Sequence, residues 1–218
     1  HYINETIAEN AASAGNGVQR IYADVPDQPL LVQTLGQVGF AVYARQTIWR
    51  LNDSNESDWS VTQQLNDQFL AQGNRRGLVV RAVNREDEWS LLRLYALATP
   101  RKVQIAEGSA PASTALSDLT VKPPILEWWQ SGEVTSLVLE ERGDVRACLR
   151  VVVANEGVWL QIWGDMLRME SSITAELIAQ GLRYVRERVQ RHSRRLPVYT
   201  AVRDYQGGLG PVLADFGF

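Results

Sequence analysis

Three β-favouring segments in series, followed by a long amphipathic helix and a fourth such segment, constrain the fold of this chain most strongly. The three segments cover residues 134–141, 145–154 and 158–165, and short runs of turn-forming residues separate them. Short turns join antiparallel strands, whereas a helical crossover joins parallel strands. The order therefore predicts an α/β (α+β) fold, with a mixed central sheet and helices on both faces.

The crossover helix is expected over residues 171–192, because apolar side chains recur there three and four positions apart. These side chains are Ile173, Leu177, Ile178, Leu182, Val185 and Val189. Upstream, residues 78–83 form a further predicted strand, and a helix capped near Asn84 continues until Thr99-Pro100. The spacing of Trp89, Leu92, Tyr95 and Ala96 predicts that this helix buries those four side chains.

Residues 22–40 and 199–218 have nearly the same pattern of side chains. Each segment has a β-favouring run, a polar turn, and a helix with two leucines four positions apart, and each ends in Gly-Phe. The matched pairs are Tyr22/Tyr199, Val25/Val202, Asp27/Asp204, Leu31/Leu209, Leu35/Leu213, Gly39/Gly217 and Phe40/Phe218. We expect both glycines to end their helices in the left-handed conformation. The similarity suggests a duplicated unit, of which only the first copy continues into a β-favouring run at 41–51.

Composition excludes several classes of protein. The 218 residues are 45% hydrophobic and 22% charged, as in ordinary globular domains, and the net charge of −3 gives no global reason to expect a nucleic-acid partner. One Cys and two His argue against a metal site, and a single Cys fits a reducing, cytoplasmic compartment. No apolar run is long enough for a membrane helix. The chain begins with His1 without a visible signal peptide, so we expect a fragment or a processed product.

The order of elements in residues 75–218 resembles the GNAT superfamily of acyl-coenzyme A dependent N-acyltransferases. Members of that family habitually have Gly-Phe after their fourth helix, as at Gly39-Phe40 and Gly217-Phe218. The resemblance implies three parts: the C-terminal half of one GNAT-like unit (1–52), a linker with a helix (53–74), and a second unit that lacks its last strand (75–218).

A missing last strand would leave an unpaired sheet edge. Lost residues, a partner chain in a homodimer, or docking of the 41–51 strand could each cover that edge, and a sheet shared between the two halves is the favoured arrangement.

The resemblance also implies an acetyl-CoA site. The family's Q/R-x-x-G-x-G/A loop holds the pyrophosphate of coenzyme A with backbone N–H groups at a helix N-terminus. The equivalent stretch here is Arg168, Met169, Glu170, Ser171, Ser172 and Ile173, and it follows Ile162 and Trp163 on a strand where the family carries a β-bulge. Ser171 and Ile173 replace the two small residues, and the Glu170 carboxylate would repel a pyrophosphate. The stretch is either a degenerate cofactor loop or an ordinary helix cap at Ser171.

Candidates for the chemistry are few. The family often uses a Tyr, four places before the Gly of Gly-Phe, to protonate the leaving thiolate, but Leu35 and Leu213 hold those positions. Tyr205 is the substitute proton donor and Asp165 the candidate base, although each also fits a plain packing or turn role. On the strand that precedes Asp165, two tryptophans and Gln161 share one face, which lines an acceptor pocket or packs against another part of the chain.

The resemblance thus implies an acyl-CoA dependent N-acyltransferase that acts on a small-molecule or peptide amine. The alternative is an inactive GNAT-like module that binds a partner or has a structural role. Six arginines between 183 and 195 could contact RNA, but such residues more often form a solvated helix face.

Overall fold

The computed structural model describes residues 23, 25–52, 78–107, 132–164, 170–189 and 196–218. The chain divides into two compact units, His1–Ala41 and Val42–Phe218. None of the helices in the described ranges has the length and apolar character needed to cross a membrane.

The described part of the first unit contains helix α2 (Pro29–Gln37). Pro29 stands at its first position, where the missing N–H costs no hydrogen bond. The helix ends at Gly39, whose φ of 95° lies in the left-handed region, and the N–H of Phe40 donates to the carbonyl of Leu35. The predicted helix and its glycine end are confirmed.

The second unit is built on one mixed sheet. Its strands are β1 (Gln46–Arg50), β2 (Leu78–Ala82), β3 (Glu133–Glu141), β4 (Asp144–Ala154), β5 (Gly157–Gly164) and β6 (Val198–Arg203). They lie in the order β1-β6-β5-β4-β3-β2, and every neighbouring pair is antiparallel except β5–β6. The turn between β3 and β4 has positive φ at both Arg142 and Gly143, which matches the right-handed twist of the two strands.

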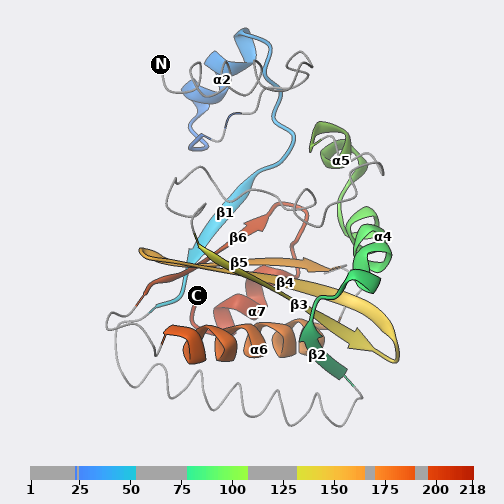
Figure 1. The fold of residues 1–218 in the computed structure, drawn as a ribbon. Coiled ribbons are helices and arrows are strands. Elements are labelled where there is room, and N and C mark those ends of the chain that lie inside the picture. The colour runs from blue at the N-terminus through green and yellow to red at the C-terminus, as the bar shows by residue number, and fades with distance from the viewer. Residues whose placement is uncertain (1–22, 24, 53–77, 108–131, 165–169, 190–195) are drawn as a thin grey trace, which may run out of the picture. The chain divides into compact units, whose positions relative to one another are not determined.

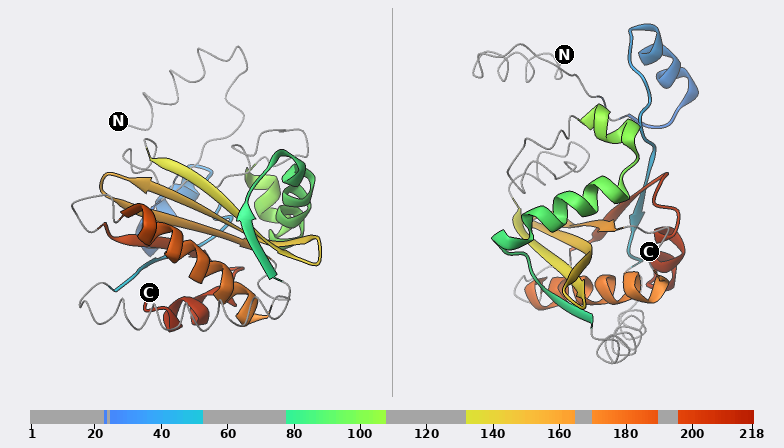
Figure 2. Two further views of the ribbon diagram at one scale, coloured as in Figure 1. Left: turned by 60° about the horizontal axis from the view of Figure 1, so that its bottom comes forward. Right: turned by 90° about the vertical axis from the view of Figure 1, so that its right-hand side faces the viewer.

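Helices cover both faces of this sheet, as predicted. On one face lie α6 (Ser171–Val189) and α7 (Leu209–Asp215), and on the other lies α4 (Glu88–Ala98), which follows the 3-10 turn η1 (Arg85–Asp87) (Figures 1 and 2). A short helix, α5 (Arg101–Glu107), follows α4 in a stretch for which the sequence analysis predicted no helix.

Alternate residues of β4 explain why the strand is apolar along most of its length. Leu149 and Val151 are fully buried against α6, and Cys148 packs with Leu91 and Leu94 of α4 on the opposite face. A strand that is covered on both faces needs apolar residues at successive positions rather than at every second one.

Helix α6 approaches β4 closely at Gly181. A Cβ at this position would lie 2.1 Å from the Cδ2 of Leu149, which is fully buried. Only a residue without a side chain lets the helix lie this near the sheet.

The C-terminal segment repeats the helix ending of the first unit. Gly217 has a φ of 86°, and the N–H of Phe218 donates to the carbonyl of Leu213, as that of Phe40 does to Leu35. The similarity found in the sequence therefore extends to the backbone at both glycines. That the two segments arose by duplication stays a prediction.

Strand β1 supplies the sheet edge that the C-terminal segment lacks. It pairs antiparallel with β6 from Gln46↔Arg203 to Arg50↔Tyr199, and the N–H of Asn52 donates to the carbonyl of Gly217. Docking of the strand predicted within 41–51 is confirmed by this pairing. The proposed domain boundaries at 52 and 74 stay predictions.

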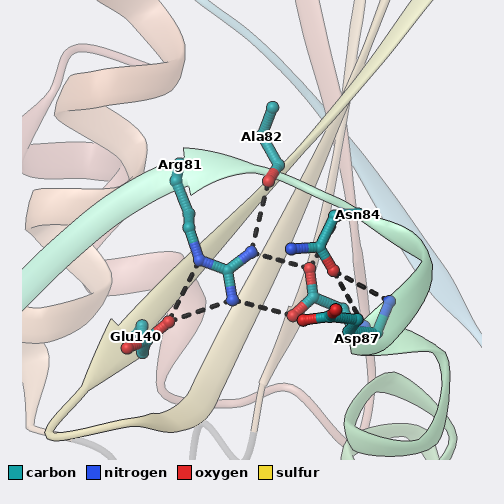
Figure 3. A network of polar contacts seen from close by, with 6 residues as sticks. Arg81, Ala82, Asn84, Asp87 and Glu140 are labelled. Atoms are coloured by element: carbon teal, nitrogen blue, oxygen red, sulfur yellow. Dashed lines mark hydrogen bonds and ion pairs between the residues drawn. The ribbon is translucent and has the colours of Figure 1, made fainter.

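A group of charged side chains holds the start of α4 against the sheet (Figure 3). The Arg81 guanidinium on β2 donates two hydrogen bonds to the buried carboxylate of Asp87, at 2.7 and 2.8 Å, and one to Glu140 on β3 at 3.0 Å. Asn84 caps the turn: its side chain accepts from the N–H of Asp87, whose carboxylate accepts from the N–H of Asn84. The cap predicted near Asn84 is confirmed.

This anchoring fixes which side of α4 faces inward. The helix buries Leu91, Leu94 and Tyr95, whereas Trp89 is 77% exposed. The predicted buried face was therefore wrong at Trp89. The reason is that the 3-10 turn and the buried Asp87 set the rotation of the helix, which its hydrophobic spacing alone did not reveal.

We expect Gly181→Ala to lower the free energy of unfolding by about 1–3 kcal/mol, because the added methyl overpacks the contact with Leu149. Gly210→Ala is the matched control, since a Cβ there meets only Trp49 at 3.5 Å, an ordinary contact. Urea denaturation of both variants measures the difference. Equal stability of the two variants would contradict the close approach of α6 to β4.

We expect Asp87→Asn to lower the free energy of unfolding at pH 7 by about 1.5–3 kcal/mol, the range for hydrogen bonds to charged groups. Its hydrogen bonds with Arg81, and then the N–H of Asn84, hold the Asp87 pKa below its ordinary value of 3.8. A lowered folded pKa adds stability above the unfolded value, and this stability is lost as the pH falls below about 4.

The acid dependence separates this variant from a general loss of packing. Denaturation curves between pH 7 and pH 2.5 should show a smaller acid-induced loss in Asp87→Asn than in the native protein. Glu86→Gln, an exposed change in the same turn, should keep the native slope. The same slope in all three proteins would contradict the role of Asp87.

Candidate functional site

The sheet opens between its two parallel strands. β5 and β6 pair only at Val158↔Val198, Trp159↔Tyr199 and Leu160↔Thr200. β5 then continues to Gly164 and β6 to Arg203, and their arrows diverge in Figure 1. Beyond Leu160 the facing edges of the two strands therefore present backbone groups that do not bond to each other.

Gln206 bridges the two strands just beyond this fork. Its side-chain Nε2 donates to the carbonyl of Ile162 on β5 at 2.9 Å, and its Oε1 accepts from the N–H of Arg203 at 3.0 Å. The side chain is buried, so it satisfies two backbone groups that water does not reach. Gln206 thus sets the width of the opening. The sequence analysis missed this residue, because a polar side chain in a turn gives no sign of a partner 44 positions earlier.

The N-terminus of α6 lies at the same end of the sheet as this fork. β5 ends at Gly164 and α6 begins at Ser171, and a β-α-β crossover returns the helix from the carboxyl end of its first strand. First-turn N–H groups and the helix dipole favour an anion at that point. The arrangement can therefore bind a phosphate or a carboxylate.

Glu170 occupies the capping position of α6. Its carbonyl accepts from the N–H of Ile173 at 2.9 Å and from that of Thr174 at 3.3 Å, while its carboxylate accepts from the hydroxyl of Ser172 at 3.3 Å. Because the helix begins at Ser171, the interpretation of Ser171 as the cap is wrong by one residue. The side chain of Glu170 is exposed and places its own negative charge beside the first turn.

The other predicted cofactor-binding residues divide into two groups. Ile162 and Ile173 are buried in the core between the sheet and α6, so only their backbones could contact a ligand. Trp163 is half-buried on the opposite face, against Leu91 and Leu94 of α4. Asp165, Arg168 and Met169 lie outside the described residues.

Tyr205 lies in the turn between β6 and α7, at the open end of the β5–β6 pair. Its hydroxyl accepts from the Arg203 guanidinium at 3.1 Å, and the same guanidinium lies 5.9 Å from the centre of its ring. A cation next to the phenol favours the phenolate form that remains after proton donation. Leu213, which stands at the family's tyrosine position, is fully buried in α7.

The predicted β-bulge in the 158–165 segment was wrong. β4 and β5 pair without interruption from Ala147↔Gly164 to Ala154↔Gly157. The described register shift lies instead between β3 and β4, near Leu139 and Glu140. The divergence of β5 from β6 thus follows from the twist of the strands and from the bridge at Gln206, without an extra residue in β5.

One charged side chain of the sheet escaped the sequence analysis. Arg150 lies on the face of β4 opposite α6, half-buried, between Ser136 of β3 and Gln161 of β5. Burial lowers the pKa of its guanidinium from the usual value. The signal was available, because the run VRACLRVVVA has Arg150 at the one position where period-two alternation would put an apolar residue.

Other reactive groups of the described sheet do not form a catalytic cluster. Burial raises the pKa of the Cys148 thiol to about 12, so the thiolate is scarce at neutral pH. No group of three His, Cys, Asp or Glu side chains within the described ranges is placed to hold a metal ion.

Comparisons with known proteins relate the chain only to solved structures. No family model and no curated protein matches it. One similar structure is a functionally unknown conserved protein from Staphylococcus epidermidis, at 9% identity over 89% of this chain with a TM-score of 0.48. Another is a GCN5-related N-acetyltransferase-like protein from Streptococcus suis, at 14% identity over 88% of this chain with a TM-score of 0.47. The chain spans 65% of the length of each of these two proteins.

Proposed function

We propose that the second unit transfers an acyl group, such as acetyl, from coenzyme A to an amine. The observation that carries this proposal is the parallel β5–β6 pair, which separates after Leu160 at the end of the sheet where α6 begins. The unpaired edges suit the pantetheine arm of coenzyme A, because its two amides can bond to strand backbones. The first turn of α6 suits the pyrophosphate.

The reaction would be a direct transfer. The acceptor nitrogen attacks the thioester carbonyl carbon, the C–S bond breaks, and coenzyme A leaves as a thiolate that takes one proton. The amine loses one proton in the same sequence. In this proposal Tyr205 donates to the thiolate and Asp165 accepts from the amine. The acceptor would be a small-molecule or peptide amine in the cytoplasm.

The second candidate is a GNAT-like module without activity. Its support is the Glu170 carboxylate, which stands at the helix start where an anionic ligand would bind, together with Ile173 in place of a small residue. A homodimer stays a prediction for either candidate.

Calorimetric titration with acetyl-CoA tests the two candidates. Under the proposal the native protein binds acetyl-CoA, and Glu170→Gln binds it roughly five- to tenfold more tightly, because about 1 kcal/mol of like-charge repulsion at the α6 N-terminus is removed. Glu187→Gln, at an exposed position near the other end of the same helix, is the control and should leave the affinity unchanged. No heat with any of the three proteins at millimolar acetyl-CoA would favour the module without activity.

If amines are acylated, we expect Tyr205→Phe to lower kcat by about 100-fold and to leave the KM for acetyl-CoA within a factor of three, because the change removes a proton donor but keeps the ring. Tyr199→Phe on β6 is the matched control. Release of the coenzyme A thiol measures both rates. An unchanged kcat in Tyr205→Phe would remove Tyr205 from the mechanism.

A further inference from the structure

Arg150 is a cation in a mainly apolar part of the sheet. Along β4, the residues on either side of it on the same face are Cys148 and Val152, and both are buried. Across the sheet, Ser136 of β3 and Gln161 of β5 lie directly beside it. The three strands thus place one guanidinium, one hydroxyl and one amide in a row.

Arg150 has no hydrogen bond or ion pair with any residue in the described ranges. Other arginines in those ranges form ion pairs, namely Arg81, Arg146, Arg183 and Arg188. The acids of the same face cannot serve Arg150, because Arg81 already engages both Asp87 and Glu140. Its titratable neighbour is the Cys148 thiol, which burial keeps neutral.

A half-buried guanidinium without an anion is unfavourable. Arginine stays protonated at all physiological pH values, so it cannot escape the cost of desolvation by losing its charge. Its planar N–H groups match two oxygens of a carboxylate or a phosphate. An oxyanion from outside the chain would restore the hydrogen bonds that burial removes.

The position of Arg150 connects it to the fork in the sheet. Gln161, its neighbour on β5, is the first residue after the last β5–β6 pair at Leu160↔Thr200. Arg150 therefore lies one strand away from the point where the strands separate, on the face opposite the core that α6 covers. A ligand bound at the fork could extend one group toward it.

We propose that Arg150 binds the acidic group, a carboxylate or a phosphate, of the amine that accepts the acyl group at the fork. This inference rests on the proposed function and narrows the acceptor to amines that carry an oxyanion. Ser136 and Gln161 supply further hydrogen bonds on either side. The neutral form of the same amine would leave the guanidinium without a partner.

Paired acceptors test this inference. With acetyl-CoA present, 4-aminobutyrate is compared with butylamine, and O-phosphoethanolamine with ethanolamine, by release of the coenzyme A thiol. We expect at least a tenfold higher kcat/KM for the charged member of one pair, and that pair identifies the carboxylate or the phosphate. Arg150→Met should reduce the preference to near one, whereas Arg93→Met, at an exposed site on α4, should keep it.

A binding measurement without acetyl-CoA separates this inference from the proposed function. Trp159 and Trp163 share the face of Arg150, so their fluorescence reports ligands there. We expect a saturable change with glutarate or with inorganic phosphate, absent with glutaramide, weaker in Arg150→Lys and lost in Arg150→Met. That result without acylation of any amine would overturn the proposed function and keep the anion site.

Two results would overturn the anion site itself. One is an equal fluorescence response of the native protein and Arg150→Met to both anions, or acylation with the same preference in both. The other is a melting temperature of Arg150→Met more than 5 °C below that of the native protein, since this would show that the chain supplies its own counterion. We expect Arg150→Met to melt at the native temperature or above it.

Discussion

The close packing of α6 against β4 is the contact on which the candidate site depends. Gly181 lets the helix lie against Leu149, and this contact holds the helix in the crossover between β5 and β6. The direction of the crossover places the helix N-terminus at the end of the sheet where the two strands separate. A bulkier residue at position 181 would move the helix away from the sheet, and the first turn of α6 would move with it.

Buried charge is treated in two different ways on the face opposite α6. Arg81 is enclosed by Asp87 and Glu140, and together they fix the start of α4. Arg150 lies on the same face without a described acid beside it. The first arrangement explains a structural feature, since every charge has its hydrogen bonds. The second has no structural explanation within the described residues, and for that reason it points to a ligand.

The two similar segments of the chain meet different conditions. Both end their helices with the same backbone bonds at Gly39 and Gly217. The strand that follows the first of them, β1, pairs with β6, which precedes the second. One segment thus completes the sheet of the other, which leaves no unpaired edge beside β6.

Local patterns determined most of the elements from sequence alone. Period-two and period-3.6 hydrophobicity identified β2 to β6 and α6, and the glycines at 39 and 217 marked two helix ends, because neighbours along the chain encode these features. The element order also led to a mixed sheet with helices on both faces. Of the candidate site, the sequence located the α6 N-terminus and Tyr205.

Tertiary structure decided the features that depend on segments far apart in the chain. The bridge from Gln206 to Ile162, the exposure of Trp89 and the isolation of Arg150 all follow from which distant strands and helices come together. A residue's own sequence context does not specify its partner or its burial. These depend on how the whole sheet twists and packs, since the free energy of each contact is set by every surface that it excludes from water.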